Sequence, residues 1–201
     1  MKTLVVAALA TALAGCSGLR PTEARHYFVL EAPPSTASAP QASPKEGVLL
    51  IGVPTVAEFY DGQAMVFSRT AGQLSHYQHS SWAEPPGRRL TMLLLAELDA
   101  RAIFRQVAVA GSGVRGRVLL ATHLQEIYHD VSSAPGVARV AVVAEVIDLP
   151  RHALIARRTF SAAEPVLSHD AAGAAQGCGR ALGTVIAEVA QWVAEVAPSG
   201  R

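Results

Sequence analysis

A Ser-His-Asp run and a glycine-rich run are the parts of the sequence closest in composition to catalytic and cofactor-binding motifs. Residues 168–170 read Ser-His-Asp, but a hydrolase triad is assembled from separated segments, and no G-x-S-x-G turn occurs. We expect Ser168 or Asp170 to cap the helix that follows. Residues 111–116 match G-x-G-x-x-G, yet the next residues read as a strand where a dinucleotide fold needs a helix. This run therefore predicts a turn.

The seven histidines lack the repeated spacing of a zinc site. Alternation along a strand puts His76 and His79 on opposite faces, and it separates His123 from Glu126 in the same way. Three further histidines are isolated in the sequence: His26, His129 and His152. The sequence therefore predicts neither a metal site nor a cofactor.

Cys178 and the run Trp82-Ala83-Glu84-Pro85 are the remaining candidates. Cys178 lies on the apolar stripe of the last predicted helix, which predicts a buried structural thiol rather than an exposed catalytic one. In the second motif, Trp82 and Pro85 are typical of a packed corner that begins a helix. The alternative is a contact with a partner through Trp82, Glu84 and Pro85, because tryptophan is enriched at binding hot spots.

The first sixteen residues have the layout of a signal peptide that ends at a cysteine. Lys2 is followed by an apolar run, residues 4–13, which is too short to span a bilayer, and then by Ala14-Gly15-Cys16. This arrangement resembles the lipobox of bacterial lipoproteins, in which the cysteine is lipidated and becomes the N-terminus. The alternative is an ordinary secretory peptide with a chance cysteine. By analogy with enterobacterial lipoproteins, Ser17 favours the outer membrane.

The composition excludes several classes of protein. Hydrophobic residues make up 50% of the 201 residues, which argues against a disordered chain. There are 17 Lys and Arg against 16 Asp and Glu, too even a balance for a dedicated nucleic-acid binder. Removal of Lys2 with the signal peptide leaves a net charge of zero. We therefore expect no basic patch that could hold a membrane, and the anchor must be lipid.

Apolar periodicity predicts one α+β domain over residues 26–197, preceded by a signal peptide (1–15) and a lipidated tether (16–25). We expect a mixed, mostly antiparallel sheet covered by two main helices, a Pro/Ser/Ala-rich loop over 32–47 and a tail over 198–201. One expected helix follows Pro85 and ends near residue 103, and the other spans 170–196. The expected strands cover residues 26–31, 48–56, 64–69, 73–79, 104–110, 114–130, 137–149 and 152–162.

The order of several segments resembles the ABC-type transport auxiliary lipoprotein family, of the paraquat-inducible lipoprotein type. The segments that carry the resemblance are the lipobox at Cys16, Tyr27–Leu30, Phe59–Gly62 leading into Met65–Arg69, Trp82–Pro86, the helix over 90–104, and the close from Asp170–Gly173 to Trp192. The glycine-rich stretch 176–179 and the long loop 32–47 depart from the family pattern. The family has no accepted catalytic residues, so the resemblance assigns only Cys16, as the site of an acyl anchor such as palmitate.

The resemblance implies a non-catalytic accessory subunit of an intermembrane lipid or hydrophobic-compound transporter that supports envelope integrity. Its implied partners are a periplasm-spanning MCE-domain protein and, through it, an ABC permease and ATPase. It would be held in the outer membrane with its domain in the periplasm. A structural or assembly lipoprotein outside any transporter is the alternative, and a hydrolase using Ser168 is a third. A surface without net charge also leaves a homo-oligomer plausible.

Overall fold

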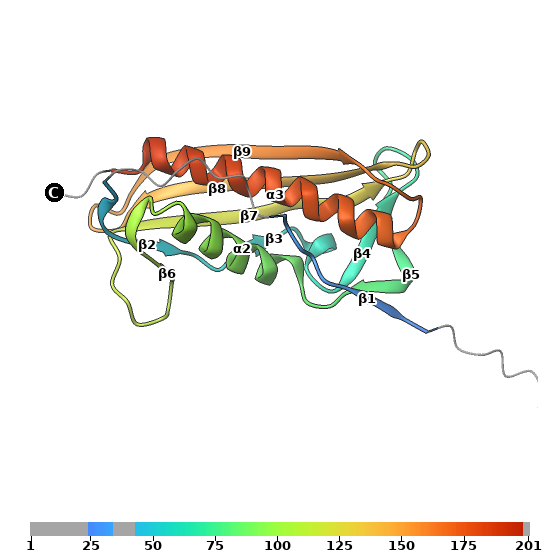
Figure 1. The fold of residues 1–201 in the computed structure, drawn as a ribbon, viewed down its shortest axis with the longest axis horizontal. Coiled ribbons are helices and arrows are strands. Elements are labelled where there is room, and N and C mark those ends of the chain that lie inside the picture. The colour runs from blue at the N-terminus through green and yellow to red at the C-terminus, as the bar shows by residue number, and fades with distance from the viewer. Residues whose placement is uncertain (1–23, 34–42, 199–201) are drawn as a thin grey trace, which may run out of the picture.

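Three long antiparallel strands form one side of the sheet: β7 (Val118–Asp130), β8 (Val137–Asp148) and the edge strand β9 (Ala153–Pro165). The computed structural model describes residues 24–33 and 43–198. Alternate residues of β8, from Ala138 to Val146, are buried, as the run of Val and Ala predicts. Figure 1 shows these strands running along the long axis of the domain.

Shorter strands lie on the other side of β7. Three of them are parallel to β7 and pair with successive stretches of it, because β7 is long enough to hold all three. Two further pairs, β2 with β6 and β1 with β5, are also parallel, whereas β4 and β5 are antiparallel. The described elements of this part are β1 (His26–Phe28), β2 (Lys45–Ile51), β3 (Thr55–Val56), the 3-10 helix η2 (Glu58–Tyr60), β4 (Ala64–Ser68), β5 (Ser75–Trp82) and β6 (Phe104–Val109).

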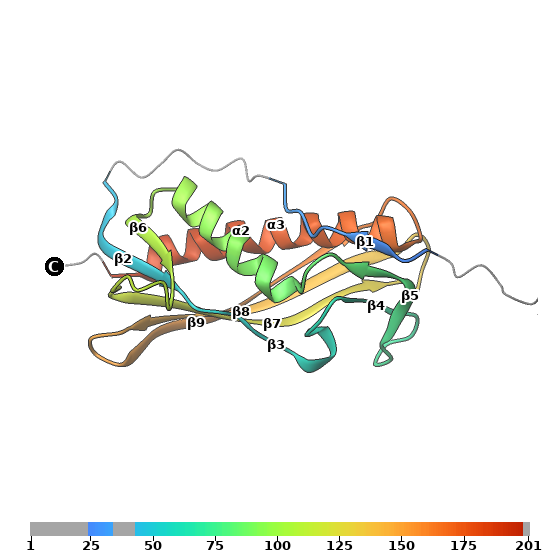
Figure 2. The same cartoon turned by 90° about the horizontal axis from the view of Figure 1, so that it is seen from below.

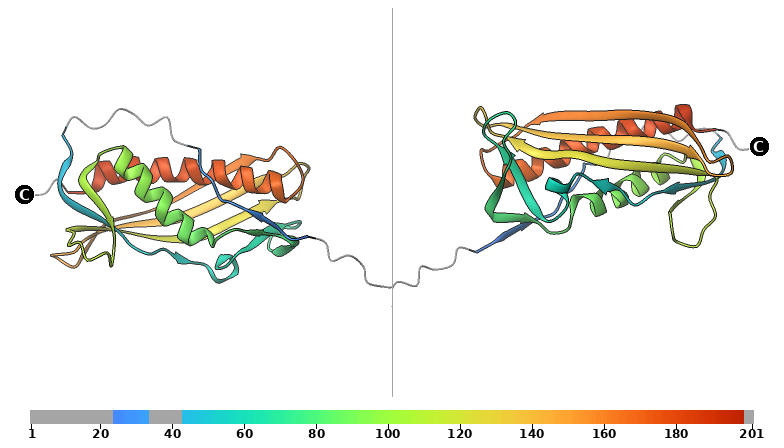
Figure 3. Two further views of the ribbon diagram at one scale, coloured as in Figure 1. Left: turned by 60° about the horizontal axis from the view of Figure 1, so that its bottom comes forward. Right: turned by 180° about the vertical axis from the view of Figure 1, so that it is seen from behind.

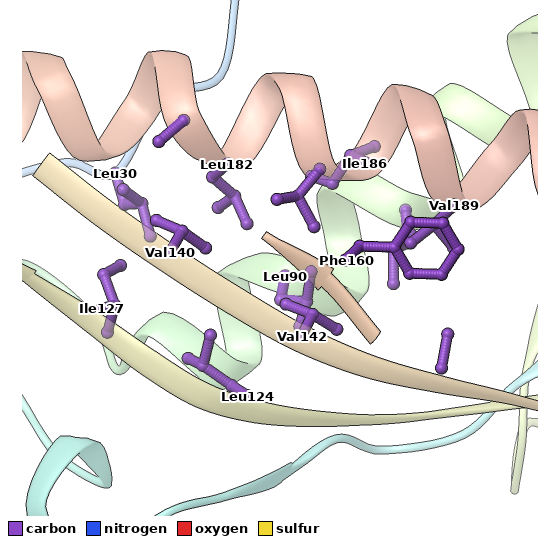
Figure 4. Packing of buried hydrophobic residues seen from close by; sticks show 14 of the residues in the cluster. Leu30, Leu90, Leu124, Ile127, Val140, Val142, Phe160, Leu182, Ile186 and Val189 are labelled. Carbon is purple, nitrogen blue, oxygen red and sulfur yellow. The ribbon is translucent and has the colours of Figure 1, made fainter. Parts of the chain in front are cut away.

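The two main helices, α2 (Pro86–Ala100) and α3 (Ala171–Val196), cover the same face of the sheet. Figure 2 shows both on one side, and the right-hand view of Figure 3 shows the long strands from the opposite side. The stripes predicted from the sequence point inward. Leu90 from α2 and Leu182 from α3 are 1% exposed, and they belong to one buried cluster with Val142 and Phe160 of the sheet (Figure 4). The predicted α+β domain with a mixed sheet and two helices is therefore confirmed.

Several element boundaries differ from those expected. The strand predicted over 48–56 is divided into β2 and β3, because Pro54 has no N–H to donate to a ladder. Strand β2 begins at Lys45, inside the predicted loop, and the Lys45 backbone N–H donates to the carbonyl of Ile103 at 2.8 Å. Strand β5 continues to Trp82 instead of ending near residue 79. The signal peptide, Cys16, loop residues 34–42 and residues 199–201 lie outside the described residues.

The glycines of α3 give room for the chain segment that follows β1. A side chain at Gly179 would overlap the carbonyl oxygen of Glu31, so the backbones of helix and segment touch there. On the other side, the guanidinium Nε of Arg89 donates to the carbonyl of Leu30 at 2.9 Å. The Leu30 side chain is fully buried between the two helices (Figure 4). The glycine at position 179 therefore permits a close approach between the backbones of α3 and this segment.

Candidate functional site

Trp82 and Pro85 lie at the corner where β1, β5 and α2 meet. Trp82 ends β5, is 2% exposed and stands opposite Phe28 in the register with β1. The backbone N–H of Ala83 donates to the Phe28 carbonyl at 2.7 Å, which continues that ladder into the corner. Pro85 precedes α2, and Pro86 occupies its first turn, where a missing N–H costs no helical hydrogen bond. The indole of Trp82 is thus a core side chain.

Glu84 is the charged residue of this motif, and its side chain is partly exposed. Its carboxylate lies 3.8 Å from Nε of Arg88 and 3.9 Å from Nη1 of Arg89, and 34% of the side chain is exposed. Ion pairs this long and this exposed contribute little to stability. If the motif contacts a partner, Glu84 rather than Trp82 is placed to do so.

A histidine network lies at the end of the domain where β4, β5 and the start of α3 meet. His129 is fully buried, with the Tyr77 hydroxyl 2.8 Å from its Nδ1 and the Pro135 carbonyl oxygen 3.1 Å from its Nε2. A carbonyl only accepts, so Nε2 carries the hydrogen, and Nδ1 of the neutral ring accepts from Tyr77. Burial lowers the pKa of His129, which favours this neutral form. Gly136, at φ +106°, packs against the ring where any side chain would overlap it.

His169 joins the same network from the segment before α3. Its Nδ1 lies 3.0 Å from the same Pro135 oxygen, and the rings of His169 and His129 are 5.9 Å apart. The Ser168 hydroxyl donates to Asp170 at 2.7 Å rather than to His169. The Asp170 carboxylate in turn accepts the Gly173 backbone N–H at 2.8 Å, and that hydrogen bond, followed by the one from Ser168, lowers its pKa. The Ser-His-Asp run therefore caps α3, as predicted.

A cavity of about 530 Å³ opens beside this network. Arg69, His76, His79 and His169 line it, together with Phe67, Tyr77 and neighbouring polar residues. The Arg69 guanidinium lies 4.6 Å from the centre of the Phe67 ring, which holds the charge at the cavity wall. Strand alternation predicts opposite faces for His76 and His79, yet both residues line this cavity.

Other candidates take structural places or lie outside the described part. Cys178 is 2% exposed, and burial raises the pKa of its thiol to about 12, so the predicted structural cysteine is confirmed. The run 111–116 leads into β7, which confirms the predicted turn. Within 24–33 and 43–198, no three His, Cys, Asp or Glu side chains gather in a way that could hold a metal ion. In the same ranges no helix is long and apolar enough to cross a membrane.

The network between His129 and His169 was missed by the sequence analysis. His129 is isolated in the sequence, but the register of β4 with β7 places it opposite Phe67, next to Tyr77 on the neighbouring strand. The spacing of His129 and His169 along the sequence does not indicate that they are neighbours, because the sheet and the turn at Pro135 bring them together. Simple alternation from Val118 would put His129 on the outer face, but the irregularity between Leu124 and Glu126 shifts the alternation, so that His129 lies on the inner face.

Comparison with known proteins supports one family. A family model described as "ABC-type transport auxiliary lipoprotein component" matches residues 28–190. The fold is similar to a crystal structure of a protein from Xanthomonas campestris, with a TM-score of 0.74 and 22% identity over 85% of this chain and 95% of that one. An uncharacterized protein matches with a TM-score of 0.67 and 14% identity, over 85% and 99% of the two chains. No functionally curated protein matches the sequence.

A hypothetical protein from Chlamydia trachomatis is more distant, with a TM-score of 0.52 and 10% identity over 75% of this chain and 97% of that one. These structural likenesses support the fold alone, because all three identities are low. The family match rests on the sequence and covers the domain from within β1 to the last turns of α3. The chain belongs to the family of ABC-type transport auxiliary lipoprotein components.

Proposed function

We propose that this protein is a non-catalytic accessory subunit of an MCE-type intermembrane transport system, anchored in the outer membrane through lipidated Cys16. The observation that carries the proposal is the family match over residues 28–190, together with the lipobox that ends at Cys16. Its substrate class is lipid or another hydrophobic compound, carried by the partner proteins. The domain acts by position: it docks a periplasm-spanning MCE-domain protein that an inner-membrane ABC permease and ATPase drive.

A role without catalysis is supported by how the described domain uses its reactive residues. Ser168 and Asp170 cap α3, His129 and His169 bond the Pro135 carbonyl, and the Cys178 thiol is buried. Each of these groups has a structural partner or no access to solvent. A hydrolase would need a serine and a histidine free to meet a substrate.

Removal of the anchor tests the proposal at its first step. Cys16→Ala is expected to release the protein from the outer-membrane fraction and to increase the permeability of the envelope to hydrophobic compounds. Ser17→Ala serves as the matched control, since it keeps the cysteine. A Cys16→Ala protein that still fractionates with the outer membrane would show that the anchor is wrong. Release of this variant from the membrane combined with a normal barrier would instead contradict the role.

A further inference from the structure

The end of the domain at which the described residues begin gathers five of the seven histidines, which the sequence scatters over four segments. The registers explain the gathering: β1 places its first residue opposite Ser80, and Phe67 of β4 lies opposite both Ser75 of β5 and the end of β7. The five are His26 on β1, His76 and His79 on β5, His129 on β7, and His169 before α3.

Two arginines add fixed positive charge to this end. Arg69 lines the cavity of about 530 Å³. Its guanidinium contacts the Phe67 ring, and within the described residues it forms no ion pair. Arg25 reaches the cavity's rim, with its Nη2 3.5 Å from the carbonyl of Gln78. A whole-chain charge of only +1 therefore conceals a local group of two arginines and five histidines, where the composition predicts no basic patch.

The acidic side chains near this end are directed elsewhere. The Asp170 carboxylate is held by the Gly173 N–H and the Ser168 hydroxyl. Asp130 pairs with Arg139 at 3.0 Å. Glu58 and Asp61 border a separate cavity on the other side of His76. An anion that enters beside Arg69 therefore meets a guanidinium, and no carboxylate is among the described residues that line the cavity.

Exposed apolar side chains flank the same end. Leu167, in the segment before α3, is 78% exposed, and Tyr27 on β1 is 61% exposed. Leu74, in the hairpin between β4 and β5, is 36% exposed. Apolar tips beside cationic groups are the combination that binds the headgroup layer of a membrane.

The tether limits which end of the domain can meet the membrane. Residues 16 to 24 span at most about 29 Å when fully extended. Helix α3, with 26 residues, is about 39 Å long and runs from the histidine-rich end to the opposite end (Figure 1). The chain enters the described structure at the histidine-rich end, so the opposite end lies beyond the reach of such a tether. This step rests on the anchor proposed above.

We propose that the cavity lined by Arg69, His76, His79 and His169 binds phosphates of anionic phospholipid headgroups in the membrane that holds Cys16. The planar guanidinium of Arg69 donates to two phosphate oxygens, and the imidazole of His76 adds an N–H donor, whereas the Nδ1–H of His169 is already donated to the Pro135 carbonyl. Leu167 and Leu74 enter the headgroup layer beside it. The lipid at Cys16 holds the protein, whereas this site fixes its orientation, with the opposite end directed into the periplasm.

The proposal is tested on the acylated protein in vesicles. The measurement is how strongly quenchers attached to lipid headgroups reduce the fluorescence of a label on the protein. Ala71→Cys labels the hairpin beside the cavity, and Ser112→Cys labels the turn at the opposite end. The native Cys178 is buried and its pKa of about 12 keeps it unreactive. We expect strong quenching at Ala71→Cys in vesicles that contain phosphatidylglycerol, weaker quenching in phosphatidylcholine alone, and little at Ser112→Cys in either.

Matched charge variants assign the effect to the cavity. Arg69→Gln is expected to lower, about fivefold, the equilibrium constant for docking of the cavity onto vesicles that contain phosphatidylglycerol, as read from the quenching at Ala71→Cys. This is the effect of one cation near an anionic surface. Arg69→Lys should restore most of it, and Arg115→Gln, the same change at the opposite end, should leave it unchanged. Leu167→Asn should weaken docking in both kinds of vesicle, and circular dichroism checks that each variant is folded.

The outcomes separate this proposal from the anchor. Flotation with the vesicles establishes the anchor independently of the label. Equal quenching in both kinds of vesicle, or equal effects of Arg69→Gln and Arg115→Gln, would overturn the headgroup site while the anchor stands. Failure of the protein to float would instead contradict the lipid anchor.

Discussion

At the scale of single residues, His129 shows how burial fixes a proton. Its two ring nitrogens are both engaged, by the Tyr77 hydroxyl and the Pro135 carbonyl, in a site without exposure to solvent. Burial raises the pKa of the Tyr77 hydroxyl to about 12, so this hydroxyl keeps its proton and donates it to Nδ1. Protonation at Nδ1 would turn that acceptor into a second donor. The network is therefore built for the neutral ring.

The first prediction concerns how stability depends on pH. Burial lowers the pKa of His129 below its unfolded value of about 6.5, so the unfolded chain takes up the proton first as pH falls. This contribution to stability is complete above about pH 6.5 and is lost as pH falls below it. Urea unfolding at a series of pH values should show a shallower loss in His129→Gln than in the wild type. The same slope in His129→Gln, with exposed His26→Gln as the control, would contradict the assignment.

Gly179 gives the second prediction at this scale. A Cβ there would overlap the backbone carbonyl of Glu31, which is not the free end of a flexible side chain. Gly179→Ala should lower the free energy of unfolding by about 1–3 kcal/mol despite the better helix propensity of alanine. At Gly183 a Cβ would lie 3.4 Å from Pro33, in near-ordinary contact, so Gly183→Ala should be neutral or raise stability by up to about 1 kcal/mol. Equal effects of the two changes in urea unfolding would rule out the close approach.

At the scale of elements, the corner at Trp82 joins strands that are far apart in the sequence. Strand β1 has three residues and stays in the sheet through its parallel ladder with β5 and the cover of Trp82. The following segment is held between α2 and α3 through Leu30. The first described segment of the chain is thus connected to both helices.

The two roles considered for this motif predict different mutant behaviour. Trp82→Ala should lower the free energy of unfolding by about 3–5 kcal/mol, because it empties a buried site. Glu84→Gln should change it by less than about 1 kcal/mol, because its ion pairs are long and partly exposed. Thermal unfolding measures both. A large loss of stability in Glu84→Gln would show that the carboxylate is structural and not placed for a partner.

Sequence periodicity predicted the elements better than their partners. The long strands and both helices were predicted because their apolar residues repeat over many positions, as in the stripe through Leu182. The parallel pairing of β2, β3 and β4 along β7 was not predicted, because sheet order depends on contacts between distant segments. The cationic end was missed for the same reason. Arg69 and His169 are a hundred residues apart and meet only after the sheet has formed.

At the scale of the whole molecule, the described features form one arrangement. The chain enters beside the cavity of Arg69, and α3 runs from that end to the opposite one. In the account proposed here, lipid at Cys16 and headgroups at the cavity hold one end. The opposite end, with the turn over 111–116 and the end of α3, is then directed toward the partner. Separate ends for membrane and partner are what an accessory subunit that acts by position requires.

The measurement that tests the central claim most directly is affinity isolation of the full-length lipoprotein from gently solubilised, crosslinked envelopes, followed by mass spectrometry. The account predicts recovery of an MCE-domain protein, with its ABC permease and ATPase, and a loss of that recovery in Cys16→Ala. Recovery of outer-membrane assembly factors without any MCE-domain protein would contradict it and would favour a structural lipoprotein outside any transporter.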